Sequence, residues 1–192
     1  MKIRKILLVL TVLAAWVTNG VLAQGPQNVL VVYYSRTGNT QEVAERLAQK
    51  FNADIERIID RKKRVGPIAF VAAGKDALAG NLTQIEPLKR NPQDYDLILI
   101  GTPSWYSHMT PAIRTFVSES DLSGKQVGVF ATAHLTGVET ALDQLAAFIN
   151  PEKAESIPKL PLRKRDLEDD VLNQKIESFF QQFNAKRRDN AQ

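Results

Sequence analysis

A short polar segment near the start of the chain has the residue types needed to bind a phosphate group. It reads Ser35-Arg36-Thr37-Gly38-Asn39-Thr40 and directly follows an apolar run, and a helical apolar stripe begins at Val43. The segment offers three hydroxyls and an amide, and its glycine allows a tight turn. The following helix directs free N–H groups and its positive dipole end to the same place. This set of neutral donors suits a phosphate monoester; a plain Ser- and Thr-rich turn that caps the helix is the alternative.

Several other kinds of site are excluded by the same sequence. The polar segment contains no lysine and no Gly-Lys-Ser/Thr, which a P-loop needs for a triphosphate, and it lacks the GxGxxG spacing of a dinucleotide fold. The chain of 192 residues has no cysteine. Disulfides, thiolate metal sites and cysteine nucleophiles are therefore ruled out.

Apolar runs alternate with helical stripes along the chain. Strands are expected at 29–34, 54–59, 97–100, 127–132 and 155–160, the last at a sheet edge because Pro158 interrupts it. Thr136, with Glu139 three residues later, predicts a capping box for a helix. The alternation predicts an α/β fold: a doubly wound parallel sheet with helices on both faces. Ligands of such sheets bind at the carboxyl ends of the strands, so the loops after Tyr34, Ile100 and Thr132 should form the site.

Aromatic residues distinguish the second of these loops. It reads Thr102-Pro103-Ser104-Trp105-Tyr106-Ser107-His108-Met109, and the third loop reads Ala131-Thr132-Ala133-His134-Leu135-Thr136-Gly137. Two adjacent aromatic side chains are costly to leave in water unless they contact something flat. The two histidines are far apart and no carboxylate cluster accompanies them, so no metal site is expected.

The segment Ser35–Thr40 resembles the first loop of the flavodoxins, which reads Ser/Thr-x-Thr-Gly-x-Thr and holds the phosphate of FMN. It matches that pattern at each specified position. The likeness extends from about Asn28 to Phe183. It is strongest to a branch of the family with a "GP…AG.DAL.G" segment, here Gly66-Pro67 through Gly80. The resemblance implies a flavodoxin-like five-stranded sheet of strand order 2-1-3-4-5, with FMN as the cofactor.

The resemblance also implies which residues contact FMN. In flavodoxins the second loop lines the isoalloxazine ring, so either Trp105 or Tyr106 stacks on it, or Trp105 is an ordinary packing residue. In the third loop the contacts are expected through backbone groups, and His134 is either a proton donor to reduced flavin or a polar loop residue. No catalytic residue is expected. The expected cofactor-binding residues are Ser35, Arg36, Thr37, Gly38, Asn39, Thr40, Thr102, Pro103, Ser104, Trp105, Tyr106, Ser107, Thr132, Ala133 and His134.

The first 23 residues have the three parts of a secretory signal peptide. Lys2, Arg4 and Lys5 are basic, an apolar stretch follows at 6–17, and Val21-Leu22-Ala23 places small side chains at the cleavage positions. This predicts cleavage after Ala23, a flavodoxin-like domain at 24–192, and export to the periplasm or the cell exterior. The apolar stretch is shorter than the roughly 20 residues of a spanning helix, so no stable membrane span is expected; an uncleaved anchor is the alternative.

Removal of that segment weakens the argument for a nucleic-acid partner. The whole chain has a formal charge of +4, from 25 basic and 21 acidic residues, but the first 23 residues contain three basic residues and no acidic one. The remaining chain is close to neutral, so no nucleic-acid partner is expected.

The long stretch from Asp60 to Asp96 is either a lid over the flavin edge or a surface excursion. Its basic run Arg61–Arg64 is either a solvated face or a docking site for an acidic partner. A short helix is expected within the stretch, with its buried face formed by Ile68, Val71, Ala72 and Leu78.

Three functions remain open on the sequence alone. The favoured one is FMN-dependent electron transfer outside the cytoplasm to a redox partner protein, because no conspicuous catalytic acid or base accompanies the loops. The second is an FMN-dependent NAD(P)H:quinone-type reductase with a small quinone-like acceptor. The third is an interaction module that keeps the fold but no longer binds FMN. The oligomeric state is not indicated.

Overall fold

One five-stranded parallel sheet organises the chain. The computed structural model describes residues 28–64 and 66–189, so the predicted signal peptide and its cleavage site lie outside the described residues. The strand order is β2-β1-β3-β4-β5 and every neighbouring pair is parallel, which confirms the predicted fold class. The strands are β1 (Val29–Tyr33), β2 (Asp54–Arg57), β3 (Leu97–Pro103), β4 (Gln126–Ala133) and β5 (Lys159–Arg163).

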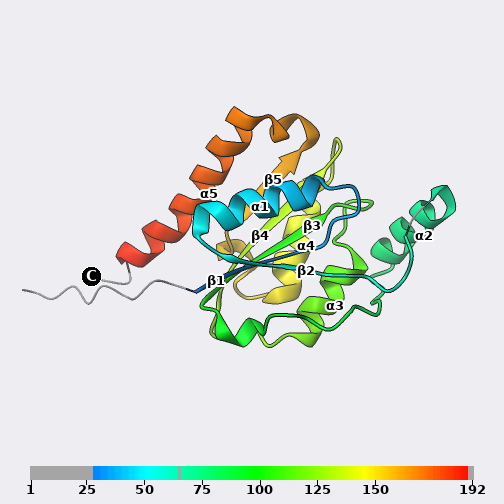
Figure 1. Ribbon diagram of the computed structural model, residues 1–192, viewed down its shortest axis with the longest axis horizontal. Helices are drawn as coiled ribbons and strands as arrows, with labels where there is room; N and C mark the ends of the chain where they lie inside the picture. Colours follow the sequence, from blue (N-terminus) through cyan, green and yellow to red (C-terminus); the bar gives the residue numbers. More distant parts are fainter. Residues whose placement is uncertain (1–27, 65, 190–192) are drawn as a thin grey trace, which may run out of the picture.

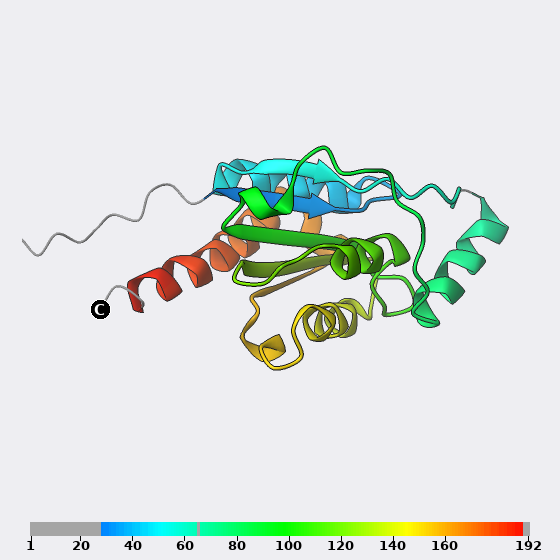
Figure 2. The ribbon, with the colours of Figure 1, turned by 90° about the horizontal axis from the view of Figure 1, so that it is seen from below.

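Helices cover both faces of this sheet (Figures 1 and 2). α1 and α5 lie on one face and α3 and α4 on the other, while α2 stands apart beyond the carboxyl ends of the strands. Within residues 28–64 and 66–189, no helix is both long enough and apolar enough to cross a membrane. The helices are α1 (Asn39–Phe51), α2 (Pro67–Leu78), α3 (Pro111–Glu119), α4 (Val138–Ile149) and α5 (Asp169–Asp189).

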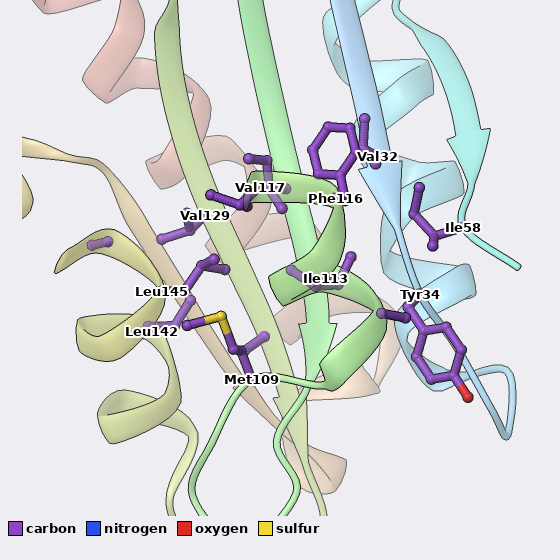
Figure 3. Close-up of a cluster of buried hydrophobic side chains, with 14 of the residues drawn as sticks. Val32, Tyr34, Ile58, Met109, Ile113, Phe116, Val117, Val129, Leu142 and Leu145 are labelled. Carbon is purple, nitrogen blue, oxygen red and sulfur yellow. The ribbon is translucent and has the colours of Figure 1, made fainter. Parts of the chain in front are cut away.

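Apolar side chains form a core layer on each face of the sheet. Along β1, Leu30 and Val32 belong to the layer under α3 and α4, while Val31 and Tyr33 belong to the layer under α1 and α5. Burial on both faces explains why β1 reads as a continuous apolar run. Figure 3 shows the layer under α3 and α4, where Phe116 lies against the strands. The two layers fix the carboxyl ends of β1, β3 and β4 beside one another.

One predicted helix cap and one predicted strand boundary are wrong. α4 begins at Val138, and its N-cap is Gly137 in the left-handed region (φ 81°) rather than Thr136. The Glu139 carboxylate pairs with Arg163 of β5 instead of completing a capping box. β5 begins at Lys159, later than expected. Its predicted position at a sheet edge is confirmed. A proline is tolerated in an edge strand because one side of the strand needs no N–H donor.

The predicted helix in the stretch 60–96 is confirmed as α2, but its predicted buried face is wrong at Val71 and Leu78. Ala72 is half-buried, and the Ile68 side chain lies outside what the structure describes. Ala73, Gly74 and Ala77 are buried, whereas Val71 and Leu78 are 46% and 59% exposed. Val71 and Leu78 therefore point away from the body. Ala73 and Ala77 belong to the core layer under α3 and α4, and a Cβ on Gly74 would lie 1.9 Å from the Tyr106 ring, so that position has no room for a larger side chain.

Candidate functional site

The three loops that the sequence singled out meet at a cavity of about 430 Å³. It lies at the carboxyl ends of β1, β3 and β4, and its volume is within the roughly 300–1,000 Å³ typical of small-molecule sites. The cavity is lined by Arg36, Thr37, Asn39, Thr40, Gly74, Pro103, Ser104, Trp105, Tyr106, Thr132, Ala133 and His134. Eleven of these twelve were expected from the sequence, and Gly74 of α2 was not.

The first loop is shaped by Gly38. Its φ of 97° is one that side-chain-bearing residues rarely adopt, and the buried Ser35 Oγ accepts a hydrogen bond from its N–H (3.1 Å). Gly38 is also the N-cap of α1, and no side chain caps this helix end. The first N–H groups of a helix have no partner within the helix, so here they are free to bind an anion between Thr37, Asn39 and Thr40.

A hydrogen bond between two buried threonines joins the first loop to the third. Thr40 Oγ1 and Thr132 Oγ1 are 2.8 Å apart. The Thr132 carbonyl in turn accepts from the N–H of Ser104 (2.8 Å), and Ser104 Oγ donates to the carbonyl of Gly137 (2.9 Å). All three loops are therefore connected by direct hydrogen bonds, which fixes the shape of the cavity.

The second loop contains a strained turn. Trp105 and His108 exchange two backbone hydrogen bonds, of 2.9 and 3.0 Å, around Tyr106 (φ 49°) and Ser107 (φ 65°). A type I′ turn has positive φ at both central positions, and glycine and asparagine are the residues that favour it. Two non-glycine residues in this region cost about 1–3 kcal/mol each, so surrounding contacts must stabilise the turn.

Glycines on both sides provide those contacts. A Cβ on Gly74 of α2 would lie 1.9 Å from the Tyr106 ring, so this ring rests on the backbone of the helix. A Cβ on Gly137 would lie 2.1 Å from Ser107 Oγ. His108 Nδ1 also lies 2.6 Å from the Tyr106 carbonyl oxygen. The turn is thus held between the start of α4 and the middle of α2.

The two aromatic residues of this turn have different surroundings. Tyr106 is 57% exposed, whereas Trp105 is 8% exposed and belongs to the core layer under α3 and α4. The Trp105 ring meets Tyr34 edge-on at 5.6 Å between centroids. The guanidinium carbons of Arg36 and Arg64 lie 5.4 and 5.7 Å from its centroid, within cation–π range. Trp105 therefore forms the inner wall of the cavity and Tyr106 the outer wall.

Four expected residues shape the loops without lining the cavity: Ser35, Gly38, Thr102 and Ser107. Thr102 illustrates how. Its fully buried Oγ1 accepts from the N–H of Thr110 (3.0 Å) and lies 3.2 Å from Thr110 Oγ1, which joins the two ends of the second loop. Gly74, which the sequence reasoning missed as a site residue, lies inside the Gly66–Gly80 segment on which the family resemblance partly rested.

The basic run Arg61–Arg64 is not uniformly solvated. The Arg64 side chain is 3% exposed, and it is ion-paired with Asp60 and Asp76. Burial disfavours the charged guanidinium, but the hydrogen bonds to both carboxylates outweigh burial and raise the pKa of Arg64. Hydrogen bonds from Lys62 and Arg64 hold the pKa of Asp76 well below its usual range. If this run docks an acidic partner, Arg64 therefore does not take part, because its charge is buried and already paired.

Acidic and metal-binding groups are sparse around the cavity. None of its described lining residues is a carboxylic acid, and the only ionisable side chains among them are those of Arg36, Tyr106 and His134. In the part of the chain that the structure describes, no cluster of three or more His, Cys, Asp or Glu residues could hold a metal ion.

Comparison with known proteins identifies the family. The family model described as flavodoxin matches residues 75–177, just over half of the chain. The chain belongs to the flavodoxin family. The matched region contains the second and third loops, and the first loop, with its Thr-Gly-x-Thr segment, lies N-terminal to it.

Solved structures of flavoproteins share this flavodoxin fold. A flavoprotein from Lactobacillus acidophilus NCFM, solved in complex with FMN, is 20% identical (TM-score 0.57), with 77% of this chain and 99% of that chain covered. A WrbA-like flavodoxin from Agrobacterium tumefaciens is 17% identical (TM-score 0.52; 84% and 98% covered). Oxidised Flavodoxin 2 from Bacillus cereus is 18% identical (TM-score 0.50; 83% and 99% covered). At these identities the likeness establishes the fold.

Proposed function

We propose that this flavodoxin binds FMN in the cavity, with its phosphate at the first loop and its isoalloxazine ring between the second and third loops. The observation that carries the proposal is that one cavity combines the open N-terminus of α1 with an aromatic wall. The Lactobacillus acidophilus flavoprotein of the same fold was solved in complex with FMN, which supports the assignment.

The residues present fit both ends of this cofactor. Thr37, Asn39 and Thr40 line the cavity where the first N–H groups of α1 are free, and such a set of neutral donors with a helix dipole suits a phosphate. Trp105 and Tyr106 supply apolar surface for a flat ring. The backbone of the second loop would surround the ring edge.

We further propose that the protein transfers electrons to a redox partner protein outside the cytoplasm, after removal of residues 1–23. Bound FMN would supply the one- or two-electron chemistry. The residues of this chain bind and orient the ring, and none of the described lining residues offers a carboxylic acid for proton transfer to a substrate. His134 is exposed and lines the cavity. The signal-like composition of residues 1–23 supports export.

The test of cofactor binding is a fluorescence titration of the apo-protein, residues 24–192, with FMN and with riboflavin in parallel. Saturable quenching of FMN fluorescence is expected. The double variant Thr37→Ala, Asn39→Ala changes two exposed lining residues and keeps the Thr40–Thr132 hydrogen bond, so it should weaken FMN binding and leave riboflavin binding nearly unchanged, because riboflavin lacks the phosphate. Thr140→Ala, an exposed threonine on α4, is the control and should bind FMN normally.

Two outcomes would contradict the proposal. Failure of the folded protein to bind FMN would leave an interaction module as the better description. Equal weakening of FMN and riboflavin in the double variant would mean that the first loop does not contact the phosphate.

Export and carrier function have separate tests. Expression of the full chain in a bacterium should yield a periplasmic protein whose mass corresponds to a chain that begins at Gln24. The FMN-loaded protein should exchange electrons with a redox protein but show no sustained turnover of NAD(P)H with a quinone. Sustained turnover would favour the reductase, and recovery of the intact chain in the cytoplasm would refute export.

A further inference from the structure

Arg64 is a buried cation next to the proposed flavin site. Its side chain is 3% exposed, its Nε donates to Asp60 Oδ2 (2.5 Å), and its Nη1 donates to Asp76 Oδ2 (2.8 Å). Asp60 follows β2, and Asp76 lies in the last turns of α2. The arginine therefore joins the end of a strand to the helix that stands apart from the body.

The two carboxylates are themselves held in place. Asp60 Oδ1 accepts from Thr83 Oγ1 (2.7 Å) and from the N–H of Lys62 (2.9 Å). Asp76 accepts from Lys62 Nζ (2.7 Å) and from Asn81 Nδ2 (3.2 Å). Because both acceptors are fixed by several bonds, the planar guanidinium has one orientation, which a flexible ammonium group would not reproduce.

That orientation places Arg64 against the inner wall of the cavity. Its Cζ is 5.7 Å from the centroid of the Trp105 ring, and Tyr34 meets the same ring edge-on. A guanidinium within about 6 Å of an indole face is attracted to it, more strongly when both are shielded from water, as here. Arg64 thus adds an attraction that favours the observed position of the Trp105 ring, beside that of Arg36, whose Cζ is 5.4 Å from the same centroid.

The cost of burying the Arg64–Asp60 ion pair, whose two side chains are each 3% exposed, needs a compensating role. Buried ion pairs often add little stability relative to apolar residues, and in some proteins they specify one conformation instead. Here two cations, Arg64 and Lys62, meet two carboxylates at the side of a cavity wall. The arrangement neutralises itself, so its effect at the cavity is mainly geometric.

We propose that Arg64 is a positioning residue, which fixes Trp105 as the inner wall and so prearranges the cavity for a flat ligand. The inference deepens the proposed function and rests on it for the identity of that ligand. Its first part, the restraint on Trp105, can be measured without FMN. A ring that is held before binding loses less entropy on binding, which favours affinity.

The chain offers a direct reporter of this restraint. It has two tryptophans, Trp16 and Trp105, and only Trp105 remains in residues 24–192. Tryptophan emission excited at 295 nm, with its anisotropy and its quenching by acrylamide, therefore reports on Trp105 in the apo-protein.

The experiment compares Arg64→Met and Arg64→Lys with two matched controls. Arg61→Met removes an exposed charge from the same basic run, and Arg46→Met removes an arginine that pairs with Glu42 and Asp169 on the far side of the sheet. Arg64→Met should increase acrylamide quenching severalfold, lower the anisotropy and weaken FMN binding about tenfold. Arg64→Lys should give values of acrylamide quenching, anisotropy and FMN affinity between those of Arg64→Met and those of the unsubstituted protein. Both controls should retain the quenching and FMN affinity of the unsubstituted protein.

Each result bears on the proposal. Unchanged quenching in a folded Arg64→Met protein would overturn it, and if that variant does not fold, unchanged quenching in Arg64→Lys would do the same. Equal changes in Arg46→Met would show a general loss of stability and would also overturn it. If the unsubstituted protein binds no FMN, the proposed function fails, whereas the acrylamide data still decide whether Arg64 holds Trp105.

Discussion

Replacement of Gly74 by alanine should have opposite effects on two properties: it should stabilise α2, and it should alter the cavity so that FMN binds more weakly. Gly74 lies in the interior of the helix and lines the cavity, and a Cβ there would be 1.9 Å from Cε2 and 2.1 Å from Cδ2 of Tyr106. Both atoms belong to the ring of a side chain that is 57% exposed. The Tyr106 ring can therefore swing toward solvent instead of forcing the backbone apart.

Two opposing free energies follow from this geometry. Alanine in place of glycine in a helix interior stabilises by about 1 kcal/mol, which raises Tm by about 2–4 °C for a protein of this size. Displacement of the Tyr106 ring removes an aromatic contact of about 0.5–1.5 kcal/mol from a bound flat ring, or roughly a twofold to tenfold loss of FMN affinity. Displacement of the ring also removes a contact that holds the strained turn, which offsets part of the gain in helix stability, so we expect little net change in stability and weaker FMN binding.

The assay is a double-mutant cycle with Tyr106→Ala, measured by FMN titration and by thermal unfolding of the apo-protein. In the Tyr106→Ala background, Gly74→Ala should raise Tm and leave FMN affinity unchanged, because the side chain that it displaces is absent. An equal loss of affinity in both backgrounds would refute the role of Tyr106. A fall in Tm of several degrees in the single variant would refute the assumption that the ring moves freely.

Two further predictions concern stability. Gly101→Ala should destabilise by roughly 1–3 kcal/mol, because its Cβ would lie 2.1 Å from Cζ of the fully buried Phe130 ring; an unchanged urea midpoint would contradict this. Asp76→Asn should destabilise the protein at pH 7, and the difference in stability should shrink as pH falls below about 4. Hydrogen bonds from Lys62 and Arg64 lower the pKa of the Asp76 carboxyl in the folded state. The ionised carboxylate therefore stabilises the fold at pH values above its unfolded-state pKa, and this stabilisation is lost toward acid. Urea unfolding at pH 7 and pH 3 tests the second prediction, and an equal difference at both values would count against it.

Much of the architecture could be predicted from local patterns. A strand buried on both faces must be apolar at every position, as Val29–Tyr33 is, and a helix on a sheet shows its apolar stripe at 3.6-residue spacing. Parallel strands bring their carboxyl ends to one edge of the sheet, so the loops after β1, β3 and β4 could be assigned to one site before any contact was known. The family resemblance then supplied the strand order, which local patterns alone do not specify.

Details that depend on distant partners could not be predicted in this way. Thr136 and Glu139 have the spacing of a capping box, but the ion pair of Glu139 with Arg163 and the close approach of Ser107 to Gly137 produce a different helix start. Val71 and Leu78 of α2 were expected to be buried, yet they are exposed, and Gly74 lies beneath Tyr106.

The amino-acid sequence by itself determined the fold class and which three loops meet at the cavity, because strand burial, helix periodicity and a glycine turn are local properties. Only the tertiary structure decided the walls of that site. Arg64 reads as one more charge in an exposed basic run until folding brings Asp76 of α2 and the Trp105 ring against it. Whether a charged side chain is solvated or buried depends on partners that the chain supplies from other elements, and a linear pattern does not contain that information.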